Sequence, residues 1–164
     1  MENKIIFKPI GIIHSPFKKP VGMPIQPAGA KGIKGTIEIF PEYKDGLKDL
    51  DGFSNIILLF NFHLSKNYNL KVMPYMEDEI RGVFATRAPH RPNQIGLSIV
   101  RLNKIQDNIM HVSNVDIIDG TPLLDIKPFV PKFDCFDIDE NTEVGWLKKR
   151  VQKVDNHKSD RRFS

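Results

Sequence analysis

Several features that would assign the chain to a class at once are missing from its sequence. It has one cysteine, Cys135, so no internal disulfide can form, and no Cys or His cluster has the spacing of a structural zinc site. No apolar run approaches the roughly 20 residues that cross a bilayer. Residues 1–11 lack the long apolar stretch and the cleavage site of a signal peptide. We therefore expect a protein of the reducing cytoplasm that needs no metal and does not enter a membrane.

The motifs of several enzyme classes are missing as well. The sequence contains no P-loop, GxGxxG, HExxH or nucleophile-elbow motif, which argues against Rossmann dinucleotide binding and hydrolysis by a catalytic triad. What it does contain is 40% apolar and 27% charged residues over 164 positions, the length and composition of one globular domain with a real core. We place this domain at residues 1–147 and a basic C-terminal tail at residues 148–164.

The positive charge is concentrated in that tail. Residues 148–164 hold seven basic and two acidic side chains, a net charge of +5, so residues 1–147 carry about −1 of the total of +4. A basic segment can bind the phosphates of a nucleic acid. A solvated helix or a frayed terminus explains the same composition, and the sequence leaves these alternatives open.

Short apolar stretches between turn residues indicate a mainly β protein. Residues 55–62 form a continuous apolar run, typical of a strand buried on both faces. Asp107-Asn108 occupies a hairpin position. Further strands are expected at residues 5–13, 36–40, 83–86, 97–105, 109–118 and 123–126, short helices at 41–50 and 145–154, and a surface loop at 65–80. The pattern fits a closed or nearly closed β-barrel with few short helices, one of them near the C-terminus.

The stretch from Gly82 to Gly96, GVFATRAPHRPNQIG, stands out chemically. An apolar start gives way to Arg87, His90, Arg91 and Asn93, and two prolines stiffen the polar part. A rigid polar loop between strands is a common place for a binding site. An ordinary connecting loop with solvated arginines accounts for the spacing equally well.

Other polar clusters also sit where expected strands end. They are Gln26 in a Pro- and Gly-rich loop, His63 after the apolar run, Asp116 to Thr121, and Asp125 with Lys127. Each has a plain structural explanation: a core histidine, good turn chemistry, or an exposed ion pair that contributes little stability. Phe62 and Phe84 read as core residues. The sequence alone does not show whether these clusters meet in space.

Taken together, these segments resemble the TsaA-like family, whose best-described members are S-adenosylmethionine-dependent tRNA (adenine-N6)-methyltransferases. The resemblance runs in family order over about residues 5–133 and rests on IGIIHSPF (10–17), PIQ (24–26), LDGFS (50–54), GVFATR (82–87), RPN with Ile95-Gly96, and DGTP through DIKP (119–128). It implies a single-sheeted β-barrel that forms a homodimer, with the methyl donor in a cleft near the dimer interface. The acceptor that it implies is the N6 of a threonylcarbamoyl-adenosine next to the anticodon.

The resemblance also assigns roles to residues. The donor contacts of the family fall on Pro24, Ile25, Gln26, Phe62, His63, Arg87, Leu97, Asp116, Ile117, Ile118, Asp119 and Thr121. Apart from the resemblance, Arg91 and Lys127 are the expected substrate-binding residues. The acceptor nitrogen must lose a proton, and Asp119, His90 and Asp125 are the candidate catalytic residues, among which the sequence does not choose.

The leading hypothesis is therefore a methyltransferase that uses S-adenosylmethionine as cofactor and tRNA as substrate. A methyltransferase with a small-molecule acceptor and a non-catalytic S-adenosylmethionine-binding module are the alternatives. Well-described bacterial members of the family carry a further C-terminal domain that is expected to hold tRNA, whereas this sequence has only its short basic tail after the barrel. This difference bears on the acceptor and leaves the donor assignment untouched.

Overall fold

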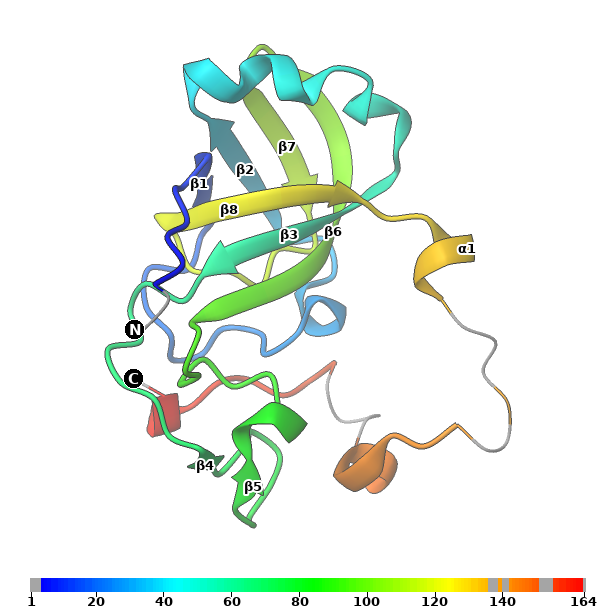
Figure 1. Cartoon of the computed structure of the whole chain (residues 1–164). Coiled ribbons are helices and arrows are strands. Elements are labelled where there is room, and N and C mark those ends of the chain that lie inside the picture. The colour runs from blue at the N-terminus through cyan, green and yellow to red at the C-terminus, as the bar shows by residue number, and fades with distance from the viewer. Residues whose placement is uncertain (1–3, 136–138, 140–141, 151–154, 164) are drawn as a thin grey trace.

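Six strands close into one antiparallel barrel in the computed structural model, which describes residues 4–135, 139, 142–150 and 155–163 (Figure 1). Every neighbouring pair is antiparallel. In spatial order the strands are β1 Gly11–His14, β2 Lys34–Ile39, β7 Ile109–Ser113, β6 Ile95–Gln106, β3 Asn55–Asn61 and β8 Thr121–Pro128. The single-sheeted barrel expected from the sequence is thus confirmed.

The barrel interior is filled by alternate residues of each strand, because successive side chains of a strand point to opposite faces. Ile13, Ile37, Leu58, Met110 and Leu123 are fully buried there. The expectation that residues 55–62 are buried on both faces was wrong. In β3, buried residues alternate with partly exposed ones, because the outer face of a barrel wall looks toward solvent. The hairpin at Asp107-Asn108 is confirmed between β6 and β7.

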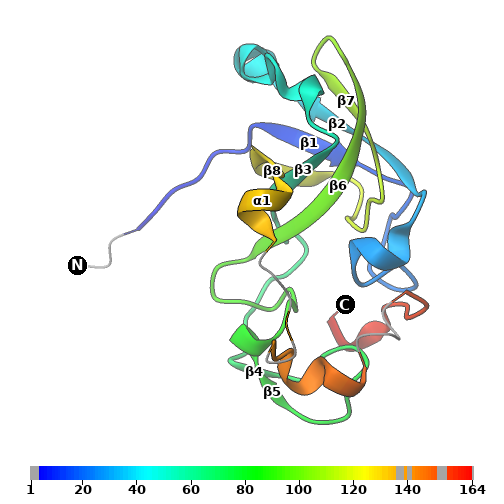
Figure 2. The same cartoon turned by 90° about the vertical axis from the view of Figure 1, so that its right-hand side faces the viewer.

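A second layer, which we call the cap, lies below the barrel (Figures 1 and 2). The cap consists of residues 62–94, which connect β3 to β6, and of the C-terminal segment, residues 142–150 and 155–163. It has a two-stranded sheet, β4 Lys71–Val72 and β5 Arg81–Gly82, and a small core of Val72, Val83, Ala88 and Phe163 with Tyr75 against it. Val72 and the buried side chain of Glu77 contradict the expected surface loop at residues 65–80.

The described end of the chain is packed into the cap. Phe163 and Ser159 are buried, so a solvated or frayed terminus is the wrong description for these residues. Arg150 donates to the carbonyl of Met76 and forms an ion pair with Glu77. Arg162 donates to the carbonyl groups of Pro74 and Glu77. The described residues of the basic tail are thus part of the cap and contribute to its core.

Regular helices are almost absent from the described residues. The one α-helix is α1, Pro131–Asp134, and the 3₁₀ segments are Pro27–Ala30, Pro41–Leu47, Leu50–Gly52, Val83–Ala85, Gly145–Lys149 and Arg161–Phe163. None of these helices is long and apolar enough to cross a membrane. The expected helix at residues 41–50 is broken at Asp49, whose φ of 64° is left-handed. The expected C-terminal helix is a 3₁₀ turn at Gly145–Lys149, and residues 151–154 lie outside the described part.

Two expected strands also differ from the structure. Residues 83–86 form a 3₁₀ turn, in which both the backbone N–H and the hydroxyl of Thr86 donate to the carbonyl of Val83. The guanidinium of Arg91 donates to the same carbonyl and to that of Thr86, which holds the turn closed. Of residues 5–13, only those from Gly11 onward belong to β1, and Ile5, Ile6 and Phe7 are exposed.

Gly96 is required by the packing at the lower end of the barrel. A Cβ at this position would lie 2.3 Å from the buried ring of Phe60, closer than real contacts allow. We expect Gly96→Ala to lower the free energy of unfolding by about 1–3 kcal/mol, the usual cost of overpacking. Urea unfolding measures this, with Gly82→Ala as the matched control, because a Cβ at Gly82 meets nothing within 4 Å. Equal stability of the two variants would contradict the expectation.

Candidate functional site

A cavity of about 890 Å³ lies between the lower end of the barrel and the cap. Its volume is near the upper end of the roughly 300–1,000 Å³ that ligand sites span. Its walls come from six stretches of the chain that are far apart in sequence, at residues 20–28, 60–65, 74–76, 84–91, 95–98 and 116–121, and from four residues of the C-terminal segment. The lining is mostly apolar, with a few polar side chains among the apolar ones.

The cavity collects the donor-binding residues expected from the sequence, with one exception. The residues that line it are Pro24, Ile25, Gln26, Phe62, His63, Arg87, Leu97, Asp116, Ile117, Ile118 and Thr121. Asp119 is the exception. Clusters spread over almost 100 residues therefore meet in one place because the barrel brings the ends of β3, β6 and β8 together above the cap.

Hydrogen bonds connect these clusters across the cavity. Arg87 Nη1 donates to Gln26 Oε1 at 2.9 Å, which joins two loops 61 residues apart. His63 Nδ1 lies 3.4 Å from Thr121 Oγ1. The rings of Phe60 and Phe62 pack edge to face at 5.4 Å. The polar groups are thus held at defined positions on an apolar wall, as in sites that fix the orientation of a ligand.

Asp116 is the one carboxylate among the lining residues. Its Oδ1 accepts a hydrogen bond of 2.7 Å from Ser98 Oγ of β6. Burial among protein atoms raises the pKa of Asp116 to about 6, and the hydrogen bond from Ser98 and the charge of Arg87 offset part of that shift. A carboxyl group with such a pKa takes up and releases protons near neutral pH, as a general base must.

The three predicted catalytic residues lie outside the cavity lining. Asp119 accepts hydrogen bonds from Lys18 Nζ and the backbone N–H of Ser15, and belongs to a separate, shallow pocket beside β1 and β2. The hydrogen bond from Lys18 holds its pKa below the ordinary value, which makes it a weaker base. His90 packs its ring against Phe163 at 5.3 Å. Asp125 forms an exposed ion pair of 2.8 Å with Lys127.

The two predicted substrate-binding residues are separated from one another. Lys127 is on β8 with Asp125, away from the cavity lining. Arg91 lines the cavity, but its Nη1 donates to the carbonyl groups of Val83 and Thr86. Its guanidinium lies 5.9 Å from the centre of the exposed Phe84 ring. Phe84, expected in the core, is 76% exposed and lines the cavity, whereas its neighbour Val83 in the same turn packs into the cap core. The roles assigned to these residues stay predictions.

Sequence reasoning missed the part of the wall that comes from the C-terminal segment and from Ser98. Trp146, Leu147, Ser159 and Phe163 all line the cavity. The sequence signal was a Trp and a Phe within a stretch otherwise rich in basic residues.

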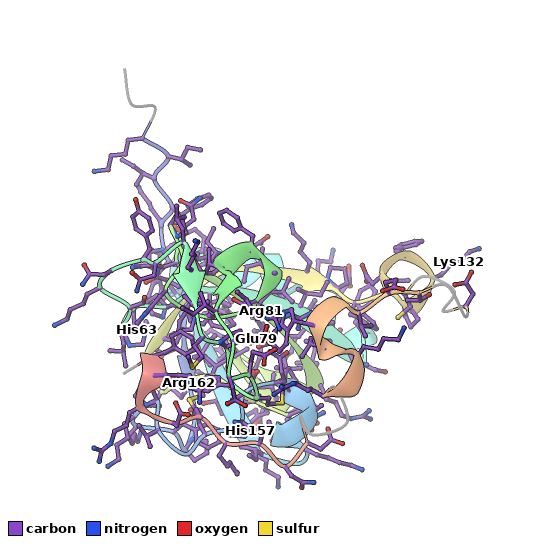
Figure 3. All side chains as sticks on the ribbon, turned by 90° about the horizontal axis from the view of Figure 1, so that it is seen from below. His63, Glu79, Arg81, Lys132, His157 and Arg162 are labelled. Carbon is purple, nitrogen blue, oxygen red and sulfur yellow. The ribbon has the colours of Figure 1, made fainter. Side chains whose placement is uncertain are left out.

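Figure 3, which views the molecule from the cap side, shows Arg81 and Arg162 near the middle, while Lys132 of α1 lies far to one side. No group of three or more His, Cys, Asp or Glu among the described residues is placed to hold a metal ion.

Residues 12–135 match the family model of the tRNA-methyltransferase O N-terminal domain. The chain belongs to this family. A probable S-adenosyl-L-methionine-binding protein of Pyrococcus abyssi is 56% identical over 97% of this chain and 85% of its own length. A tRNA (adenine(37)-N6)-methyltransferase of Mus musculus is 39% identical over 80% of this chain, which spans 32% of the mouse protein.

Solved structures of tRNA-methyltransferase O have the same fold. The crystal structure of TrmO from Pseudomonas aeruginosa superposes with a TM-score of 0.72 at 38% identity, covering 87% of this chain and 62% of that one. This chain thus spans about three fifths of the solved protein. The cavity residues at positions 20–121 fall within the part that matches the family model, whereas those of the C-terminal segment lie beyond it.

Proposed function

We propose that this protein is an S-adenosylmethionine-dependent methyltransferase that methylates the N6 of threonylcarbamoyl-adenosine next to the anticodon of tRNA. The observation that carries the proposal is the meeting of Gln26, His63, Arg87 and Asp116 in one largely apolar cavity. Family membership and the names of the relatives support the donor and the tRNA acceptor. The cytoplasm is the compartment that we propose for this reaction.

The cavity residues suit the chemistry of S-adenosylmethionine, which supplies an electrophilic methyl group on a sulfonium. Arg87 presents a guanidinium fork that matches a carboxylate such as that of the methionine part. Its present partner, the amide oxygen of Gln26, is a neutral acceptor that a carboxylate can replace. Phe62 and Leu97 supply apolar walls for the adenine or the methionine stem. By holding the reacting groups in line, these residues supply much of the rate acceleration.

Asp116 is our proposed proton acceptor. Bound S-adenosylmethionine would supply the methyl group and leave as a neutral thioether. The carboxylate of Asp116 would take the N–H proton that the acceptor N6 loses as it forms its bond to the methyl carbon. Ser98 Oγ binds Oδ1 of Asp116, which leaves Oδ2 to take the proton. Asp119, His90 and Asp125 lie outside the lining, so Asp116 is better placed for this step.

We further propose that the protein forms a homodimer through the outer face of β3 and β6. Ile95, Leu97 and Ile99 are 39%, 47% and 38% exposed on that face, and Ile57 and Leu59 pair with two of them across the strands. An apolar strip of this kind is typical of a surface covered by a partner. Leu97 also lines the cavity, so a partner would approach the site. A monomeric mass in light scattering would contradict the dimer.

The decisive experiment is incubation of the purified protein with methyl-labelled S-adenosylmethionine and total RNA from a strain that lacks the gene. We expect label in a single modified adenosine, identified by nucleoside mass spectrometry, and donor binding in calorimetry without RNA. Donor binding with label only in small molecules would support a small-molecule acceptor. Donor binding without any transfer would indicate a non-catalytic binding module, and an absence of donor binding would exclude all three.

A further inference from the structure

We infer that the C-terminal segment forms the acceptor wall of the cavity and that Trp146 stacks on the adenine ring to be methylated. The inference rests on the proposed function and extends it to residues beyond the family match, which ends at residue 135.

Backbone and side-chain hydrogen bonds tie the C-terminal segment to the loop that carries Gln26. The Ser159 backbone N–H donates to the Met23 carbonyl, and the Gly22 N–H donates to the Ser159 carbonyl, both at 2.9 Å. The Ser159 hydroxyl accepts from the Met23 N–H at 3.0 Å, and Lys158 forms a β-bridge with Pro24. The segment and the loop at residues 22–26 thus form one unit at the cavity edge.

The segment is tied just as firmly to the rest of the cap. Arg162 Nη1 donates to the carbonyl groups of Pro74 and Glu77 at 2.6 and 3.1 Å. Arg150 forms an ion pair of 3.1 Å with the buried carboxylate of Glu77. The ring of Phe163 packs edge to face on Tyr75 at 5.1 Å. With such anchors, the wall is part of the folded cap and is present before a ligand arrives.

Trp146 is placed within this wall so that its ring is available to a ligand. Its indole N–H donates to the carbonyl of Ala85 at 2.8 Å, which fixes the ring beside the turn that leads to Arg87. The side chain is only partly buried and lines the cavity. Because its single polar atom is already bonded, what the ring offers the cavity is apolar aromatic surface.

A purine is the ligand group that fits such a surface. An extruded base stacks on a fixed aromatic ring with about 1–3 kcal/mol, and a base in RNA must leave its stack to be methylated. The expected donor contacts come from other stretches, at residues 24–26, 62–63, 87, 97 and 116–121, so Trp146 is left for the acceptor. Lys148, Lys158 and Arg161 are exposed on the same segment and can bind the phosphates that flank the base.

Trp146 is the only tryptophan of the chain, so its intrinsic fluorescence reports stacking directly. We expect an anticodon stem-loop RNA with threonylcarbamoyl-adenosine to quench the emission when S-adenosylhomocysteine is bound. S-adenosylhomocysteine alone should leave the emission nearly unchanged. Quenching of the same size by S-adenosylhomocysteine alone would assign the ring to the donor adenine and overturn the inference. An emission that neither ligand changes would overturn it as well.

Substitutions separate this inference from the proposed function. We expect Trp146→Ala to raise the KM for the RNA about 5- to 150-fold, the equivalent of the stacking energy, with an unchanged Kd for S-adenosylhomocysteine. Trp146→Phe keeps a ring and should retain most of the affinity. Val144→Ala, an exposed neighbour outside the lining, is the control. Methylation by the wild type with an unchanged KM in Trp146→Ala would overturn only the inference, whereas a wild type that methylates no RNA overturns the proposed function.

Discussion

Asp116→Asn is expected to lower the rate of methyl transfer by about 10²- to 10⁴-fold, the usual contribution of a general base. The asparagine keeps the shape of the side chain and an oxygen that accepts the hydrogen bond from Ser98, but it cannot take a proton. In the wild type, the rate should rise with pH up to a pKa of about 6 and then level off. The variant should lack this rise. Single-turnover methylation between pH 5 and 8 measures both effects.

The same substitution should make the protein more stable near neutral pH. The pKa of Asp116 is raised from 3.8 to about 6 in the folded protein, so its stabilising contribution is present at low pH and is lost as the pH rises through 6. A pKa shift of this size changes the free energy of unfolding by up to about 3 kcal/mol. Urea unfolding at pH 5 and pH 7.5 should therefore show a gain for the variant that grows with pH.

Asp119→Asn is the comparison that tests the assignment. Asp119 lies only three residues away, but its carboxylate is bound to Lys18 outside the cavity. A loss of transfer confined to Asp116→Asn supports Asp116 as the proton acceptor. An equal or larger loss in Asp119→Asn would move the role to Asp119, one of the three candidates that the sequence left open.

Arg87→Ala is expected to weaken donor binding about 10- to 150-fold, since hydrogen bonds to a charged group contribute about 1.5–3 kcal/mol. Arg87→Lys should recover only part of the affinity, because an ammonium keeps the charge but lacks the planar fork. Calorimetry with S-adenosylhomocysteine measures the affinity of both variants. Arg101→Ala, an exposed position on β6 outside the lining, is the matched control.

Loss of Arg87 should also act on Asp116. The positive charge of Arg87 lowers the pKa of Asp116, so its removal should move the rise of the pH–rate profile to higher pH. Arg87→Lys keeps the positive charge, so it should restore the pH–rate profile more fully than it restores the affinity for the donor. A profile that stays in place in Arg87→Ala would show that the two side chains do not interact in the working enzyme, and full donor affinity in that variant would remove Arg87 from the donor site.

Local sequence predicted the strands and the hairpin because their causes are local. Turn residues such as Asp107-Asn108 and the apolar content of residues 97–105 are enough to indicate where strands lie. One strand prediction failed where side-chain contacts override the local composition. The segment at residues 83–86 has the composition of a strand, yet Arg91 binds its carbonyl groups and holds a 3₁₀ turn.

The choice between Asp116 and Asp119 shows the same limit in the site. Both belong to one short polar stretch, and nothing in their spacing tells which carboxylate faces the cavity. The contacts that decide are remote: Ser15 and Lys18 hold Asp119 from more than 100 residues away, and Ser98 of β6 holds Asp116. The C-terminal segment shows this limit more strongly. Its basic composition indicated a solvated tail, although Ser159 and Phe163 anchor it in the cap.

The sequence by itself determined the mainly β class, the family resemblance and a group of residues that line the cavity, because motifs such as PIQ at residues 24–26 keep their chemistry in short stretches. Only the tertiary structure decided that these stretches meet, that Asp116 and not Asp119 lines the cavity, and that the C-terminal segment supplies a wall. The physical reason is that a barrel brings distant strand ends together through pairing and burial, and the desolvation that raises the pKa of Asp116 exists only in the folded chain.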